Sequence, residues 1–122
     1  MHSKTIISVV DDDAFVRGAI ESLLQSLGFD VLAFASAEEF LKSGRIDDTS
    51  CLVTDFRMPG LTGLDLQKRL AAEGTSPPVI FITAFATEKT RNQAIDAGAV
   101  GFLDKPFSDQ ALIDCINTAL SQ

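Results

Sequence analysis

The chain of 122 residues contains no tryptophan and no tyrosine, and it has only one histidine and two cysteines. Cys51 and Cys115 stand far apart in apolar surroundings, so the close spacing of a zinc or redox pair is missing. We expect both to be buried free thiols. The single histidine, His2, is expected to be a disordered terminal residue without a chemical role.

Basic residues and long apolar runs are also scarce. Ten Lys and Arg against seventeen Asp and Glu give a net charge of −7, which argues against direct binding of nucleic acid. No apolar run approaches the ~20 residues of a membrane-spanning helix, and the first residues are polar. We therefore expect neither a signal peptide nor a membrane anchor, and a cytoplasmic location.

Five short apolar runs alternate with longer amphipathic segments. Most of the runs are rich in β-branched or aromatic residues, as is typical of buried parallel strands. The predicted strands cover 6–10, 31–34, 51–54, 79–83 and 100–103. This alternation predicts an α/β fold.

The segments between the runs carry helix signals. Apolar residues from Val16 to Leu27 recur on one helical face, and Gly28 ends that helix. Ser36 and Glu39 predict a capping box for a short second helix that ends before Gly44. The other helices are predicted at about 63–73, 87–97 and 108–120. The resulting (βα)₅ order predicts one domain over residues 1–122, a flavodoxin-like doubly wound parallel sheet with strand order 2-1-3-4-5.

Polar residues stand where the predicted strands end. They are Asp11, Asp12 and Asp13 after the first strand, Asp55 after the third, Thr83 at the end of the fourth and Lys105 after the fifth. Because the carboxyl ends of parallel strands meet at one edge of a sheet, these residues predict an acidic pocket beside a lysine.

The acidic triplet favours a divalent cation. Adjacent carboxylates repel one another unless a cation separates them, and Mg²⁺ usually takes only one or two carboxylates from a protein. One aspartate of the triplet together with Asp55 fits that preference. The alternative is a helix N-cap, a role that we expect for Asp13.

Asp55 is placed to act as a nucleophile. Pro59 and Gly60 force a turn soon after it, so the carboxylate is presented at the sheet edge. Beside a metal and the Lys105 ammonium, with Thr83 as a hydroxyl donor, it could form an aspartyl phosphate. Taken singly, Asp55 could be a turn residue, Thr83 a strand residue and Lys105 a surface charge.

Four segments in order resemble the receiver domains of bacterial two-component response regulators, the CheY-like family, and above all the FixJ-type receivers. They are Val9-Val10-Asp11-Asp12-Asp13 with Arg17, Asp55-Phe56-Arg57-Met58-Pro59-Gly60 with Gly63, Phe81-Ile82-Thr83-Ala84-Phe85, and Gly101-Phe102-Leu103-Asp104-Lys105-Pro106-Phe107. Together they span essentially the whole chain.

The resemblance implies a metal site for Mg²⁺, which Mn²⁺ could replace. Asp55, the phosphoacceptor, and Asp12 would be direct ligands, and Asp11 would bind through water. The backbone carbonyl of Arg57 would supply the third protein oxygen.

The resemblance also implies a phosphoryl cradle and a switch. Lys105, Thr83 and the Ala84 amide would hold the phosphoryl group, while Phe102 would rotate inward with Thr83. Phe102 lacks the hydroxyl of a tyrosine, so apolar burial alone should favour its inward state. The alternative for Phe102 is a plain core residue.

The family's phosphoryl donor is a sensor histidine kinase, and its signalling surface corresponds here to the predicted helix 87–97, strand 100–103 and helix 108–120. A FixJ-type parent implies a C-terminal DNA-binding output domain and a homodimer formed on phosphorylation. Such a domain is not an enzyme in the usual sense, although it assists its own phosphorylation and dephosphorylation. Arg57 and Phe85 are expected to tune the dephosphorylation rate.

Three other functions are alternatives to this one. A haloacid-dehalogenase-type phosphatase would use the Asp-x-Asp spacing of 11–13, but Phe15 replaces its Thr or Val and no cap insert is present. A flavodoxin-like flavin carrier needs a hydroxyl- and glycine-rich phosphate loop and aromatic rings about the flavin. A receiver used as a phosphorylation-independent interaction module would keep the fold without the chemistry.

Overall fold

The computed structural model describes residues 5–121, which alternate five strands with five helices. The strands are β1 (Ile6–Val10), β2 (Asp30–Phe34), β3 (Cys51–Asp55), β4 (Val79–Thr83) and β5 (Gly101–Asp104). The helices are α1 (Ala14–Ser26), α2 (Ala37–Lys42), α3 (Gly63–Ala72), α4 (Glu88–Asp96) and α5 (Asp109–Leu120). The predicted element order is confirmed, with ends that differ by one or two residues.

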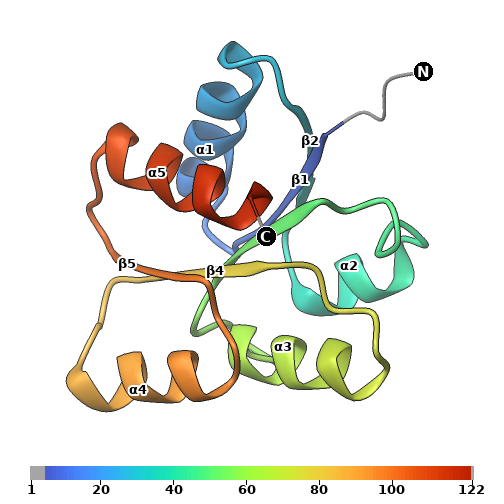
Figure 1. Ribbon diagram of the computed structural model, residues 1–122, viewed down its shortest axis with the longest axis vertical. Helices are drawn as coiled ribbons and strands as arrows, with labels where there is room; N and C mark the ends of the chain where they lie inside the picture. Colours follow the sequence, from blue (N-terminus) through green and yellow to red (C-terminus); the bar gives the residue numbers. More distant parts are fainter. Residues whose placement is uncertain (1–4, 122) are drawn as a thin grey trace.

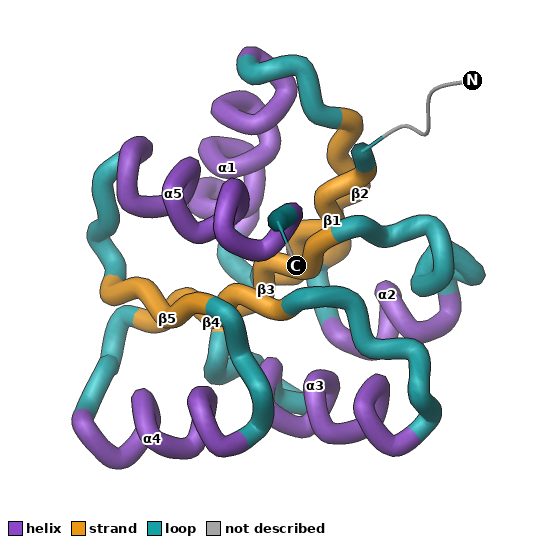
Figure 2. Tube along the Cα trace, viewed as in Figure 1, coloured by secondary structure: helices purple, strands orange, loops and turns teal. Residues whose placement is uncertain are grey.

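All strand pairs are parallel, and the strand order is β2-β1-β3-β4-β5 (Figures 1 and 2). Helices α1 and α5 cover one face of the sheet, and α2, α3 and α4 cover the other (Figure 1). The predicted doubly wound, flavodoxin-like fold is therefore confirmed. Since the order reverses between β1 and β3, the carboxyl ends of these two strands form the crevice where such sheets bind ligands.

Each face of the sheet has its own apolar core. Ile20 and Leu24 of α1 pack with Leu112 and Ile116 of α5 on one face. Phe40, Leu66 and Leu70 pack on the other face with Phe81 and neighbouring residues. Every residue of β3 and β4 is buried, which explains their continuous apolar runs.

Side-chain caps begin all five helices. Asp13 caps α1, as predicted, by accepting hydrogen bonds from the amides of Phe15 and Val16. The amide of Glu39 donates to Ser36 at 3.1 Å, but the Glu39 carboxylate accepts from the Ala35 amide and not from Ser36. The predicted capping box is therefore only half formed.

The cysteine prediction is only partly right. Both thiols are free, but Cys51 is buried while Cys115, on the flank of α5, is half-buried. Burial raises the pKa of the Cys51 thiol to about 12, which keeps it protonated. His2 lies outside the described residues. Among residues 5–121, no helix is both long and apolar enough to cross a membrane.

Candidate functional site

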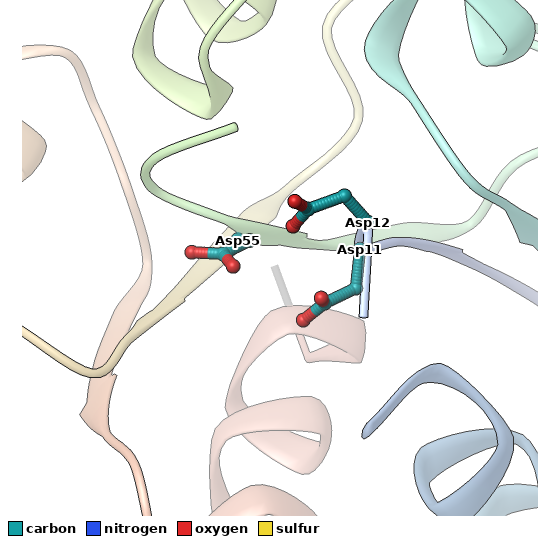
Figure 3. A group of neighbouring side chains, drawn as sticks. All are labelled: Asp11, Asp12 and Asp55. Atoms are coloured by element: carbon teal, nitrogen blue, oxygen red, sulfur yellow. The ribbon is translucent and has the colours of Figure 1, made fainter. Parts of the chain in front are cut away.

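Three carboxylates meet at the carboxyl ends of β1 and β3. The register pairs Val10 with Thr54, so Asp11 and Asp55 follow at adjacent positions of the sheet edge. Oxygen atoms of Asp11, Asp12 and Asp55 all lie within 4.8 Å of one another. Figure 3 shows the Asp11 and Asp12 side chains extending from the end of β1 toward the side where Asp55 lies. The structure thus brings the predicted acidic residues together.

Lys105 joins this group from the loop after β5. Its ammonium Nζ lies 3.0 Å from Asp11 Oδ2 and 3.0 Å from Asp55 Oδ2. The backbone holds it there, because the Lys105 amide donates to the Thr83 carbonyl at 2.7 Å. The peptide bond between Lys105 and Pro106 is cis. The lysine is thus an internal counterion of the site and not a free surface charge.

Asp11 is the most buried of the three acids, with no exposed surface. Its Oδ1 accepts from the Asp13 amide at 2.8 Å, and Arg17 Nη1 donates to its backbone carbonyl at 2.7 Å. Burial raises the pKa of the Asp11 carboxyl above its usual value, against the opposing effects of the Asp13 amide and the Lys105 ammonium. The metal-free site therefore disfavours the negative charge of Asp11.

Asp55 retains a narrow opening to solvent, with 7% of its surface exposed. Its Oδ1 accepts from the Arg57 amide at 3.2 Å, and its Oδ2 accepts from Lys105. Burial acts to lower the pKa of Lys105, but the hydrogen bonds to Asp55 and Asp11 outweigh it and the pKa rises. Lys105 therefore stays cationic beside an accessible carboxylate.

Thr83 lies at the end of β4 and is buried. Its hydroxyl accepts a hydrogen bond from the Phe85 amide at 3.2 Å. The neighbouring Ala84 is exposed, and its small side chain leaves the pocket open. Phe85 itself is 72% exposed. The Thr83 hydroxyl therefore lies at the end of the strand next to β3, close to the carboxylates.

The loop from β3 to α3 closes tightly on the site. The Phe56 amide donates to the Ile82 carbonyl, and the Gly63 amide donates to the Phe56 carbonyl. A Cβ atom at Gly63 would lie 2.1 Å from the Asp55 carbonyl oxygen, so only glycine allows this approach. Arg57 is exposed within the loop, two residues after Asp55.

Phe102, on β5, has an unforeseen polar neighbour. Its half-buried ring packs edge-on against Phe56 with a centroid distance of 5.9 Å. The guanidinium carbon of Arg91 lies 4.9 Å from the ring centroid. Apolar packing is therefore not the only interaction on this ring. Arg91 gave no signal in the sequence, because a cation–π contact between a helix and a strand follows no periodic pattern.

The donor set suits a hard divalent cation. The three aspartates of the cluster offer oxygen ligands alone, and Mg²⁺ binds through one or two carboxylates while it keeps several waters. Among residues 5–121, no histidine or cysteine joins this cluster, and zinc sites are usually built from those residues. The side chains thus fit Mg²⁺, and Mn²⁺ would fit the same oxygen ligands.

An apolar groove adjoins the carboxylates. It encloses about 540 Å³ and is lined by α1, Ala84 and the segment from Lys105 to Phe107. Phe15, on the first turn of α1, is 84% exposed at this groove. An exposed phenylalanine beside an open groove marks a surface suited to a partner.

Comparisons with known proteins agree with this geometry. The model of the family "Response regulator receiver domain" matches residues 7–117. Nodulation protein W of Bradyrhizobium diazoefficiens is 46% identical over 117 residues, which cover 96% of this chain and 52% of that protein. Transcriptional regulatory protein FixJ of the same species is 39% identical over all 122 residues, which cover 60% of FixJ. The chain thus spans about half the length of the curated relatives that it matches.

Solved structures give the same result. The structure titled FixJ-N superposes with a TM-score of 0.88 at 35% identity, covering 100% of this chain and 97% of that one. The response regulator StyR superposes with a TM-score of 0.89 at 44% identity, covering 97% of this chain and 60% of that one.

Proposed function

The chain belongs to the family of response regulator receiver domains of two-component systems, and from that premise we propose that Asp55 is its phosphoacceptor. One observation carries this proposal. Asp55 is the acid that combines an opening to solvent with a direct contact to Lys105 and a place beside two further carboxylates. A nucleophilic carboxylate needs this access, and its phosphoryl group needs the cation.

The phosphoryl donor would be a phosphohistidine on a sensor kinase. An oxygen of Asp55 forms a bond to phosphorus while the phosphorus–nitrogen bond to the kinase imidazole breaks, and that nitrogen keeps the electron pair. Lys105, now 3.0 Å from the carboxylate, would move its ammonium onto a phosphoryl oxygen. Thr83 and the Ala84 amide would donate to the other oxygens.

Asp11, Asp12, Asp55 and the Arg57 backbone carbonyl would hold Mg²⁺, with Asp11 acting through water. Bound there, the ion would neutralise charge on the carboxylates and the phosphoryl oxygens. In dephosphorylation, a water oxygen would bond to phosphorus while the bond from phosphorus to the Asp55 oxygen breaks, which releases inorganic phosphate and the free carboxylate, and the same side chains would serve this step. The domain would thus assist its own phosphorylation and dephosphorylation, and Arg57 and Phe85 at the rim would set the access of water.

The response would pass to the surface of α4, β5 and α5. Thr83 would turn toward the phosphoryl group, which breaks its bond from the Phe85 amide, and Phe102 would move inward on β5. Phosphorylation shifts this equilibrium only by binding one state more tightly than the other. The shifted surface is where a homodimer would form.

The wider function of the protein is inferred from its relatives. FixJ and TdiR are named transcriptional regulatory proteins, and this chain covers 60% and 51% of their lengths. We propose that the chain is the receiver domain of a regulator whose C-terminal output domain binds DNA. The net charge of −7 places the DNA contact on that other domain.

The groove beside Lys105 is the proposed contact for the kinase. A donor histidine must reach Asp55 from the open side of the sheet edge, and Phe15, Pro106 and Phe107 lie there. Their apolar surface suits an amphipathic helix that carries the histidine close to the carboxylate.

Acetyl phosphate with Mg²⁺ provides the test. We expect intact-mass spectrometry to show one phosphoryl adduct on the wild-type chain and none on Asp55→Asn or without Mg²⁺. Asp104→Asn, which removes an exposed acid at the end of β5, should be labelled like the wild type. An adduct on Asp55→Asn would contradict the proposal. So would no adduct on the wild type under conditions that label another receiver.

A further inference from the structure

Helix α2 carries a carboxylate that is turned onto the loop between β3 and α3. Glu38 Oε2 accepts a hydrogen bond from the Leu61 amide at 3.3 Å, across 23 residues of sequence. The other oxygen, Oε1, is buried and has no hydrogen-bond partner among the described residues. This half-satisfied carboxylate is unusual and requires an explanation.

The loop backbone approaches the same carboxylate at the preceding residue. Gly60 has a φ of +75°, and a Cβ atom there would lie 2.5 Å from Glu38 Oε2. Glycine is the residue that suits both the positive φ and the close approach of the backbone to the Glu38 carboxylate. Gly60 and Leu61 therefore both rest against one side chain from another element.

The loop held in this way carries the Arg57 carbonyl, the proposed backbone ligand of the metal. Its first part is anchored by the bond from the Arg57 amide to Asp55 and by the buried Met58 side chain. Its last part is anchored where Gly63 meets Phe56. Between these anchors, the Leu61 side chain packs on the apolar core, and the Glu38 carboxylate holds the backbone of the Gly60–Leu61 turn.

Stability alone does not explain a glutamate at this position. Glu38 is half-buried, and a carboxylate with one long backbone bond and one buried, unpartnered oxygen gains little from this contact. Within residues 5–121, no lysine or arginine lies within ion-pair distance of Glu38. Its place in the first turn of α2 gives a favourable interaction with the helix dipole, but Glu39 has the same advantage while exposed.

We propose that Glu38 is a positioning residue of the metal site. It fixes the Gly60–Leu61 turn and thereby restrains the loop that carries the Arg57 carbonyl beside the three aspartates. This inference rests on the proposed function, because it assigns Glu38 a task in the binding of Mg²⁺. Side chains that orient a ligand from outside the coordination sphere typically contribute 10-fold or more to metal affinity.

The test is a calorimetric titration of the chain with Mg²⁺ alone, well below the melting temperature of every variant. Glu38→Ala is expected to weaken Mg²⁺ binding by about tenfold. Glu38→Gln keeps an acceptor for the Leu61 amide and should restore most of the affinity. Glu39→Ala is the matched control, because it removes the same charge from the same helix and leaves the loop untouched.

The outcomes separate the two proposals. Wild-type affinity in a folded Glu38→Ala chain, or an equal loss in Glu39→Ala, overturns the role of Glu38 alone. A loss in Glu38→Gln as large as in Glu38→Ala would show a charge effect and would also overturn it. No Mg²⁺ binding by the wild type would overturn the proposed function and this inference together.

If Glu38→Ala does not fold, a second variant tests the same proposal. Gly60→Ala leaves the carboxylate in the chain but pushes it from the loop, so it should weaken Mg²⁺ binding as well. Thermal melting reports structural damage separately. A purely structural role would lower the melting temperature and leave the affinity of the folded chain unchanged.

Discussion

The Lys105 ammonium forms ion pairs with two carboxylates, those of Asp11 and Asp55. Its ammonium bridges Asp11 and Asp55 from the far end of the chain, 94 and 50 residues away. The pair of carboxylates raises the pKa of the lysine above its ordinary value, while the burial of Asp11 still raises the pKa of that acid. One cation therefore offsets only part of the charge of the site, and this imbalance is what a divalent ion would remove.

The imbalance predicts that Asp11→Asn stabilises the metal-free chain. The substitution removes a buried charge, keeps an acceptor for the Asp13 amide and leaves Lys105 paired with Asp55. We expect the free energy of unfolding to rise by on the order of 1 kcal/mol. Urea unfolding in the presence of a chelator measures it.

Asp12→Asn is the control for that experiment, because it makes the same charge change at an exposed neighbour. It should leave the metal-free stability nearly unchanged. Both variants should lose the stabilisation that Mg²⁺ gives to the wild type through mass action. A metal-free Asp11→Asn chain that is less stable than the wild type would show that the charge of Asp11 supports the fold.

At the scale of elements, the connection from β3 to α3 sets the shape of the site. It starts at Asp55 and returns to the same backbone at Gly63, whose amide donates to the Phe56 carbonyl at 3.1 Å. Thr62 and Asp65 form a reciprocal capping box that begins α3 at this point. This box was not predictable from the usual signature, which has Glu or Gln at the third position of the helix.

This geometry predicts opposite effects for two glycine substitutions. Gly63→Ala places a methyl group 2.1 Å from the Asp55 carbonyl oxygen, so the loop must move, and we expect a loss of about 3 kcal/mol. Gly18→Ala lies within α1 with no atom near the new methyl group, so it should stabilise the chain by about 0.5–1 kcal/mol. Chemical denaturation of both variants checks the pair.

The phosphorylation rate adds a second readout for these variants. Gly63→Ala should slow the reaction with acetyl phosphate in the fraction that stays folded, because the Asp55 backbone is displaced. Gly18→Ala should leave the rate unchanged. Equal losses of stability in the two variants would show that the close contact between Gly63 and the Asp55 carbonyl does not constrain the residue at position 63.

At the scale of the whole molecule, Phe102 links the two halves of the proposed switch. Its ring contacts both Phe56, which follows the proposed phosphoacceptor Asp55, and Arg91, on α4. Two contacts on one ring, one from each of these residues, would let the site and the proposed signalling surface bias the same equilibrium. Arg91 stabilises the arrangement of the unphosphorylated chain, in which its guanidinium lies over the ring.

We therefore predict that Arg91→Ala favours the inward state of Phe102 before phosphorylation. An exposed cation–π contact contributes about 0.5–1 kcal/mol, so the population ratio should shift by about two- to fivefold. Fluorine NMR of chains labelled with fluorophenylalanine measures the shift, with the Phe102 signal assigned by Phe102→Leu. Lys89→Ala, which removes another exposed cation of α4, serves as the control. Identical spectra for wild type and Arg91→Ala would contradict the role of Arg91.

Sequence reasoning predicted most of the fold and the core of the site. Buried parallel strands give continuous apolar runs, so the five strands and their order were predictable. Asp11, Asp12, Asp55 and Lys105 were predictable as neighbours because each stands at or just after the carboxyl end of a strand. The half-buried state of Cys115 was not, because it depends on how far α5 covers β5.

What the sequence determined by itself is the set of strand ends, and with it which charged residues share one edge of the sheet. Periodicity and glycine positions are local properties, so they can be recognised without the fold. Only the tertiary structure decided which side chains from other elements contact the residues around that edge. These contacts are Glu38 with the Gly60–Leu61 turn and Arg91 with the Phe102 ring. Such contacts depend on the separation and rotation of packed elements, and no local pattern encodes either quantity.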